Sequence, residues 1–266
     1  METNQAEINR DETPVGPRNK KIWILITALA VLLVSAFGVW YFLSGGTAAA
    51  ADEEIGDGNY TQAELLALLQ NDSIDEVVIE GRIITNKALE VRGSKTLSGT
   101  GSIRLSKQAS QPADAELFDK VPDVKNCEEL IYLDVSTQMS ALALQPGSSL
   151  TLKGQVEIDG NGVGNGLYVA PGASLAVEEN AAVKNGYFCN IGSDGTLTIN
   201  GGAVADSNGH NIVSNGKMTM KGGTVENAAM NNICVGENAT LSIQGGSISK
   251  SGFDGIRAVN VTTVKV

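Results

Sequence analysis

A column of polar residues in the C-terminal half has the side-chain types of a nucleophile and its base. Each member stands two residues before a recurring aliphatic position, and the members are Asn165, Cys189, His210, Asn231 and Asp254. If consecutive copies stack as neighbouring strands, the chain's single histidine, His210, lies about 4.8 Å from Cys189. A thiolate beside an imidazole, with a carboxylate nearby, is an arrangement suited to covalent catalysis.

The same column also has a plainer interpretation, in which it flanks a turn and takes any polar or small residue that fits. Asp254 stands two copies away from His210, and the sequence identifies no donors for an oxyanion. We therefore assign no catalytic residue and keep Cys189, His210 and Asp254 as candidates.

Metal ligands are scarce in this sequence. The run Asp159-Gly160-Asn161-Gly162 is similar to a calcium loop, so Asp159 and Asn161 are candidate calcium ligands, although Asp-Gly and Asn-Gly also form ordinary turns. The three cysteines, Cys127, Cys189 and Cys234, contain no Cys-x-x-Cys spacing, so we predict neither a zinc site nor a bound cofactor. We expect Cys189 and Cys234 to be buried small apolar residues.

The elements that would position these side chains belong to a repeat. Its landmark is a pair of apolar residues, which recurs 25, 22, 21, 23 and 23 residues apart. The pairs are Leu150/Leu152, Leu175/Val177, Leu197/Ile199, Met218/Met220, Leu241/Ile243 and Val264/Val266. A further aliphatic position follows each middle pair, at Val183, Val204, Val225 and Ile248, and another comes eight residues later, at Ile191, Ile212, Ile233 and Ile256. A period of this length is typical of solenoid proteins.

Short runs of alternating apolar residues between turn residues predict strands, and the repeat contains no segment long enough for a crossover helix. The sequence therefore predicts an all-β fold, a right-handed parallel β-helix with 21–25 residues and three strands per coil. Aliphatic side chains would fill internal columns, at roughly 1.5–3 kcal/mol for each buried Leu, Ile or Val.

A turn column supports the stacking. Directly before the aliphatic positions stand residues that tolerate a left-handed backbone, namely Gly166, Asn190, Asn211, Asn232 and Gly255. We interpret this column as one tight turn in every coil, with the three asparagine amides stacked in a ladder along the axis.

The segments "LTINGGAV", "MTMKGGTVEN" and "LSIQGGSISKSG" resemble the coils of pectate-lyase-like right-handed parallel β-helix proteins, most of all adhesin-like bacterial cell-surface members with Gly-Gly coil repeats. The resemblance covers roughly residues 60–266. It implies the fold, whereas the activities hosted by that fold differ widely.

Enzymes of that group hold calcium with carboxylates and use an Arg or Lys base on one outer face. The corresponding column here contains Asn185, Asp206, Asn227 and Lys250, while Glu226 and Arg257 stand elsewhere in the coils. Asp206 is therefore a further catalytic candidate. The paired carboxylates of a glycoside hydrolase are not evident.

The N-terminal part has a different composition. Residues 1–21 are a polar tail, and residues 22–43 are an uninterrupted apolar run with aromatic residues near both ends, which predicts a single transmembrane helix. Arg18, Lys20 and Lys21 precede this run, so the tail is expected in the cytoplasm and the β-helix outside a bacterial cell membrane. A cleaved signal peptide is the competing interpretation. Residues 44–60 are a linker.

Residues 61–266 form the predicted β-helix domain. Residues 61–69 predict an amphipathic helix with a Thr61–Glu64 capping box, placed to cover the first coil. Strands are predicted at 77–79, 82–85, 89–91, 102–105 and 130–133, with a loop insertion at 106–129 that is either functional or a tolerated surface excursion. Regular coils run over 142–266. The chain stops within a predicted strand, so either it continues into further coils or another chain covers the last coil, and we favour continuation.

Charge restricts the possible partners. Residues 1–43 carry four basic and four acidic residues, so the net charge of −11 belongs to the remainder. An acidic domain repels nucleic acid and polyuronates, which leaves a neutral glycan or a surface protein as the expected partner. Two functions are consistent with these observations. One is a membrane-anchored, non-catalytic scaffold or adhesin. The other is a polysaccharide lyase or glycoside hydrolase with its active site in the 106–129 loop or beyond Val266.

Overall fold

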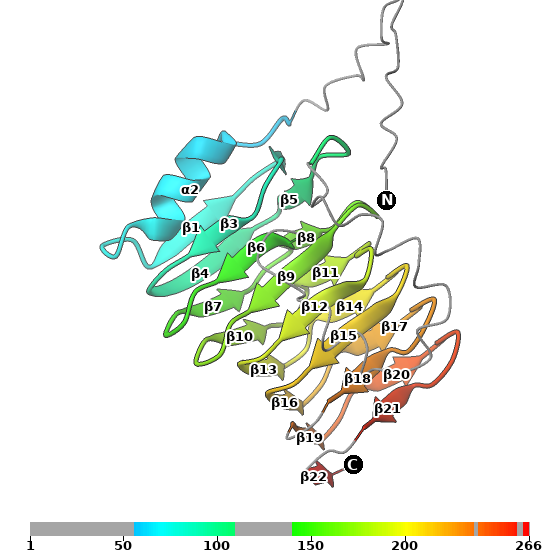
Figure 1. Ribbon diagram of the computed structural model, residues 1–266. Coiled ribbons are helices and arrows are strands. Elements are labelled where there is room, and N and C mark those ends of the chain that lie inside the picture. The colour runs from blue at the N-terminus through cyan, green and yellow to red at the C-terminus, as the bar shows by residue number, and fades with distance from the viewer. Residues whose placement is uncertain (1–55, 110–139, 237–238, 260–262, 266) are drawn as a thin grey trace, which may run out of the picture. The chain divides into compact units, whose positions relative to one another are not determined.

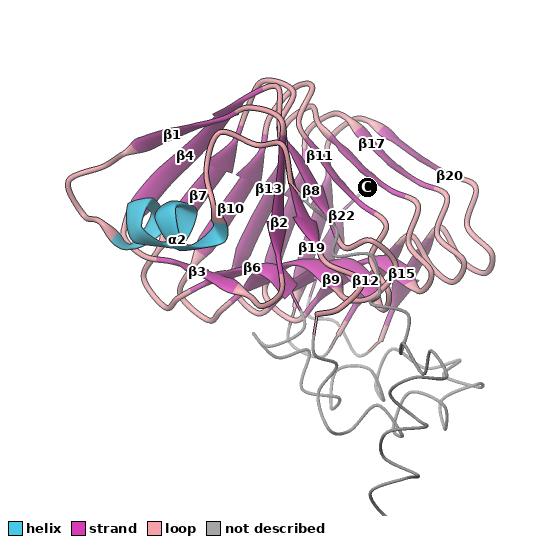
Figure 2. Ribbon diagram, turned by 90° about the horizontal axis from the view of Figure 1, so that it is seen from above, coloured by secondary structure: helices cyan, strands magenta, loops and turns pink. Residues whose placement is uncertain are grey.

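The chain folds into a right-handed parallel β-solenoid (Figure 1). The computed structural model describes residues 56–109, 140–236, 239–259 and 263–265. Three parallel sheets run along the axis, and each contains every third strand, so one coil contributes one strand to each sheet (Figure 2). The prediction of a parallel β-helix with three strands per coil is confirmed.

We call the three sheets A, B and C. Sheet A contains β1 (Glu76–Ile79), β4 (Ser94–Gly99), β7 (Ser149–Leu152), β10 (Ser174–Val177), β13 (Thr196–Ile199), β16 (Lys217–Met220), β19 (Thr240–Ile243) and β22 (Thr263–Lys265). Sheet B contains β2 (Arg82–Thr85), β5 (Ser102–Leu105), β8 (Glu157–Asp159), β11 (Ala182–Lys184), β14 (Ala203–Ala205), β17 (Thr224–Glu226) and β20 (Ser247–Ser249). Sheet C contains β3 (Leu89–Val91), β6 (Ser140–Leu144), β9 (Asn165–Val169), β12 (Cys189–Ser193), β15 (His210–Ser214), β18 (Ile233–Val235) and β21 (Ile256–Ala258).

The core consists of aliphatic columns along the axis. Each column is formed by the residues at one inward strand position in successive coils. In sheet A the first landmark residue of each coil pairs with its counterpart in the next, through Leu150, Leu175, Leu197, Met218 and Leu241. All five side chains are buried. The hydrophobic repeat therefore sets the register, because a slip by one residue would turn these side chains to the outside.

The first coils follow the predicted strands, with one exception. Strands β2, β3 and β5 have the predicted bounds and β1 begins one residue earlier, but β4 was not predicted. The reason is Lys95, which occupies the inward position that later coils give to leucine or methionine. Its side chain is buried and its Nζ donates to the carbonyl oxygen of Asn71 at 3.1 Å, where a cation is favourable because α2 ends there.

The helix α2 (Gln62–Gln70) lies at the N-terminal end of the solenoid (Figure 1), where it contacts β3 and β2. Thr61 is its N-cap: the Thr61 Oγ1 accepts from the Glu64 amide at 3.3 Å, and Glu64 Oε2 accepts from the Thr61 amide at 2.8 Å. Leu65 and Leu69 belong to the buried core. The sequence placed this helix at 61–69, and its role as an end cap stays a prediction.

Several predicted segments lie outside the described residues. These are the tail at 1–21, the apolar run at 22–43, the linker up to residue 55, the insertion from residue 110 onward and the strand at 130–133. In the part of the chain that is described, no helix has the length and apolar character needed to cross a membrane.

Candidate functional site

The structure brings the two nucleophile-and-base candidates together. Cys189 and His210 are direct partners on the neighbouring strands β12 and β15, on the outward side of sheet C. Asn165 lies one coil before them, and Asn231 and Asp254 follow in the next two coils. Cys189 is fully buried, and His210 is 1% exposed.

The environment of this pair keeps both groups neutral. Burial, with a smaller contribution from the charge of Arg257, lowers the pKa of His210 to about 4. Burial also raises the pKa of the Cys189 thiol to about 12. Since the thiolate is the nucleophilic form, the arrangement gives a buried thiol beside a neutral imidazole.

The hydrogen bonds of the column explain its polar residues. Three members of the column accept a backbone N–H from the next coil with a side-chain atom: Asn165 Oδ1 from Cys189 at 3.1 Å, His210 Nδ1 from Asn231 at 3.2 Å, and Asn231 Oδ1 from Asp254 at 2.9 Å. Asp254 itself pairs with Arg257 at 3.3 Å, so its carboxylate does not orient the imidazole. The column satisfies backbone donors where the chain enters sheet C.

The asparagine ladder forms along the corner between sheets B and C. Asn190 Nδ2 donates to Asn211 Oδ1, and Asn211 Nδ2 donates to Asn232 Oδ1, both at 2.7 Å. Each amide also donates to the last residue of a sheet B strand: Asn190 to the Ala205 carbonyl, Asn211 to that of Glu226, and Asn232 to that of Ser249. All three asparagines are completely buried.

The left-handed backbone lies at another position than predicted. Asn190, Asn211 and Asn232 do not have positive φ, and neither do Gly166 and Gly255. Positive φ occurs instead at Asn185, Asp206, Asn227 and Lys250, with values of 53–61°, directly after the strands of sheet B. The glycine at 166 has a steric cause, because a Cβ there would lie 2.5 Å from Val183 Cγ1. The buried asparagines are needed because their side-chain amides donate the hydrogen bonds of the ladder and of the sheet B carbonyls.

Asp206 therefore stands in the turn column. Its Oδ1 accepts from Asn227 Nδ2. In the next coil Lys250 Nζ pairs with Glu226 Oε2 at 2.8 Å, which raises the pKa of Lys250 and lowers that of Glu226. The lysine that could act as a base is thus held in its protonated form.

The two candidate calcium ligands are occupied by donors from the protein. Asp159 is 3% exposed, and its Oδ1 accepts from the Asn161 amide at 2.7 Å and from Asn185 Nδ2 at 3.0 Å. Asp159 Oδ2 lies 3.7 Å from Nε of Arg104, whose guanidinium also donates to Asn161 Oδ1. Arg104 thus places a positive charge beside the Asp159 carboxylate, and calcium binding by this loop stays a prediction. Among the described residues no group of three or more His, Cys, Asp or Glu side chains is placed to hold a metal ion.

The cysteines divide into two kinds. Cys189 is a free thiol, whereas Cys234 is disulfide-bonded, so the expectation of a simple buried apolar residue does not hold for Cys234. The two lie in different columns, because Cys189 pairs with His210 and Cys234 pairs with Val213 and Arg257. Cys127 lies outside the described residues.

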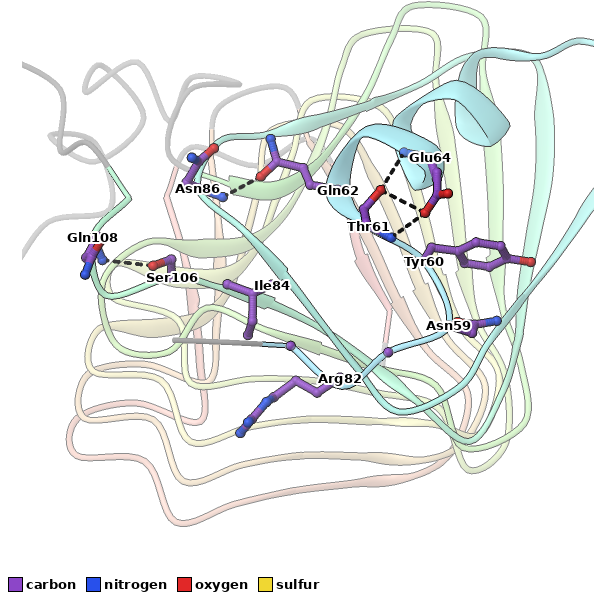
Figure 3. A pocket seen from close by; sticks show the side chains of 12 residues that line it. Asn59, Tyr60, Thr61, Gln62, Glu64, Arg82, Ile84, Asn86, Ser106 and Gln108 are labelled. Atoms are coloured by element: carbon purple, nitrogen blue, oxygen red, sulfur yellow. Dashed lines mark hydrogen bonds between the residues drawn. The ribbon is translucent and has the colours of Figure 1, made fainter. Parts of the chain in front are cut away.

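An open recess of about 580 Å³ lies beside the start of α2 and was not foreseen from the sequence (Figure 3). Its walls come from residues 56–64, 82–86 and 106–108. Gln62 Oε1 accepts from the Asn86 amide on one side, and Arg82 and Glu64 are its charged side chains. Three separated segments form it, so no local motif signals its presence.

Comparison with known proteins identifies no relative: no family model, no curated protein sequence and no solved structure matches this chain.

Proposed function

We propose that this protein is a membrane-anchored β-solenoid displayed outside a bacterial cytoplasm, and that one flat face binds a neutral glycan or a surface protein. The observation that carries the proposal is the outer face of sheet A. Its strands alternate buried and outward positions, so their outward side chains form straight rows across the coils.

Two such rows consist mainly of hydroxyl side chains. The register aligns Ser94, Ser149, Ser174, Thr196, Lys217 and Thr240 in one row, and Thr96, Thr151, Ala176, Thr198, Thr219 and Ser242 in the other. Neighbours within a row are about 4.8 Å apart, and the rows are about 6.7 Å apart. This face therefore offers a regular lattice of neutral donors and acceptors.

The chemistry of this lattice favours an uncharged partner. A hydroxyl both donates and accepts, which suits sugar hydroxyls and backbone amides. The net charge of −11 disfavours polyanions. A repeated lattice also favours an extended partner, because many weak contacts along one molecule add through effective concentration.

The proposed location depends on the apolar run at 22–43 and the basic residues before it, which favour a retained anchor with the solenoid outside. The resemblance to adhesin-like members of the pectate-lyase-like fold supports the same assignment.

The alternative is a carbohydrate-active enzyme of that fold. The recess near α2 favours this alternative, since it combines Arg82 and Glu64 with Ser106 and Gln108 at the start of the predicted insertion. Glu64 is, however, engaged in the capping box, where hydrogen bonds from Thr61 lower its pKa. A carboxylate held ionised in this way is a poor general acid.

One experiment separates the two functions. The full-length chain in detergent is tested on a panel of neutral and acidic polysaccharides, with binding and product formation measured in the same samples. We expect binding to a neutral glycan without product. Turnover that Arg82→Ala abolishes would establish the enzyme, and the absence of binding to every glycan and every candidate surface protein would reject the proposed function.

A further inference from the structure

Sheet C differs from sheets A and B because four of its strands are buried on both faces, while β3, β9 and β21 keep partly exposed or exposed positions. Every position of β6, β12, β15 and β18 is buried, whereas strands of sheet A alternate between buried and outward positions. A sheet with both faces buried is normally covered by other chain segments on both sides. The solenoid core covers the inner face of sheet C, so its outer face needs a separate cover.

The outer face of sheet C carries its own apolar cluster. Cys189, Val213 and Cys234 form this cluster apart from the core, and their exposed fractions are 0%, 4% and 0%. The described residues contribute Val259 at its edge. The cluster lies over β12, β15 and β18, close to the middle of the regular coils.

A covalent bond indicates the occupant of this face. Cys234 is disulfide-bonded and Cys189 is a free thiol. The chain has three cysteines, so Cys127 is the one that remains. Cys127 belongs to residues 110–139, which connect Ala109 after β5 to Ser140 at the start of β6 in sheet C itself.

Chain length and composition fit the same occupant. From β6 to β18 the distance along sheet C is four strand spacings, about 19 Å. The 13 residues from Cys127 to Ser140 can extend over roughly 43 Å, more than twice what is needed. The segment also contains apolar side chains that can cover Val213, namely Leu117, Phe118, Val121, Leu130, Ile131 and Leu133.

We infer that residues 110–139 dock on the outer face of sheet C and that a disulfide between Cys127 and Cys234 fixes them there. The insertion is then a structural cover that shields the Cys189 thiol. In forming the bond the two thiols lose two protons and two electrons, and the disulfide of an extracytoplasmic thiol oxidoreductase accepts them and becomes two thiols. The bond is consistent with a protein that folds outside the reducing cytoplasm.

The first test maps the bond. The full-length chain is purified without reductant, alkylated and digested with trypsin. Residues 126–153 and 222–250 form the peptides that contain Cys127 and Cys234, and 185–217 form the peptide of Cys189. We expect the first two peptides to be cross-linked within one chain, with Cys189 alkylated only after denaturation. Free Cys127 and Cys234, or a cross-link between two chains, would overturn the inference.

A second test asks whether the bond holds the cover. Reduction should lower the Tm of the wild-type protein by about 10 °C, since the bond closes a loop of about 100 residues. It should also increase tryptic cleavage at Lys120 and Lys125. Cys127→Ser should have the lowered Tm and the increased tryptic cleavage already without reductant. Reduction should then change neither quantity. Cys189→Ser is the matched control and should respond to reduction like the wild type. A Cys127→Ser variant with wild-type Tm and cleavage would contradict the docking.

Discussion

The side-chain amide of Asn190 donates a 2.7 Å hydrogen bond to the side-chain oxygen of Asn211, its counterpart in the next coil. Asn211 repeats the same bond to Asn232. One amide hydrogen of Asn190 and one of Asn211 thus continue the ladder, and all three amides also donate to a carbonyl at the end of a sheet B strand. The ladder joins two sheets and successive coils inside the buried corner of the solenoid, where unpaired polar groups are costly.

Replacement of Asn211, the central asparagine of the ladder, should strongly reduce the stability of the folded chain. Asn211→Ala removes one of the two acceptors of the Asn190 amide, one donor to the Glu226 carbonyl and the Asn211 donor to the Asn232 side-chain oxygen, and we expect a loss of about 2–4 kcal/mol in the free energy of unfolding. Chemical denaturation measures this loss. Asn200→Ala removes only a partly exposed bond to Glu178 and should cost less than about 1 kcal/mol. Equal effects of the two variants would contradict the importance of the ladder.

His210 should make stability depend on pH. The pKa of His210 is about 4 in the folded chain and 6.5 for an ordinary histidine, so the unfolded chain binds more protons between these two values. Stability is therefore complete above about pH 6.5 and declines as the pH falls towards 4, by at most about 3 kcal/mol. Denaturation at several pH values measures the decline.

The control for this pH dependence is His210→Asn. Asparagine occupies the same column at Asn165 and Asn231 and accepts the same type of backbone bond, so the variant should fold and lose only the titration. If wild type and variant decline in parallel between pH 7 and pH 4, the carboxylates rather than His210 cause the loss.

Two buried serines should be replaceable with a gain in stability. Ser193 and Ser214 occupy an inward column of sheet C between Val169 and Val235, and their hydroxyls have no hydrogen-bond partner among the described residues. We expect Ser214→Val to raise the free energy of unfolding by about 1–2 kcal/mol, because it removes a buried polar group and fills the column. Ser174→Ala on the outer face of sheet A should be neutral. Destabilisation by Ser214→Val would show that the hydroxyl has a partner such as a buried water.

The role of α2 as an end cap can be tested at its buried face. Leu69→Ala should cost about 2–4 kcal/mol, and it should increase self-association because the first coil becomes exposed. Thr61→Ala removes the capping box alone and should cost about 1 kcal/mol without self-association. Denaturation and light scattering measure the two effects. A Leu69→Ala protein that remains monomeric would mean that α2 adds stability without protecting the end.

Much of the fold could be predicted from the sequence, because the aliphatic columns repeat and each repeat fixes its own register. Contacts between distant segments could not. Lys95 hid β4, since a buried lysine makes sense only beside the end of α2. Arg104 stands 55 residues before Asp159, and its guanidinium lies beside the Asp159 carboxylate in a loop that resembles a calcium site in sequence. The left-handed turn was misplaced because asparagine suits both a turn and a buried amide ladder, and composition alone does not distinguish them.

The central proposal is that the outer face of sheet A binds the partner. A pair of matched threonine substitutions tests it most directly. Thr198→Glu places a charge in the hydroxyl rows, and Thr224→Glu makes the same change on the outer face of sheet B. Neither side chain belongs to the core, so both proteins should unfold at the wild-type temperature. With the neutral glycan or surface protein identified by the panel, we predict that Thr198→Glu weakens the affinity by about tenfold or more, equivalent to about 1.4 kcal/mol, while Thr224→Glu binds like the wild type. Unchanged affinity in Thr198→Glu, or an equal loss in both variants, would contradict the assignment of this face.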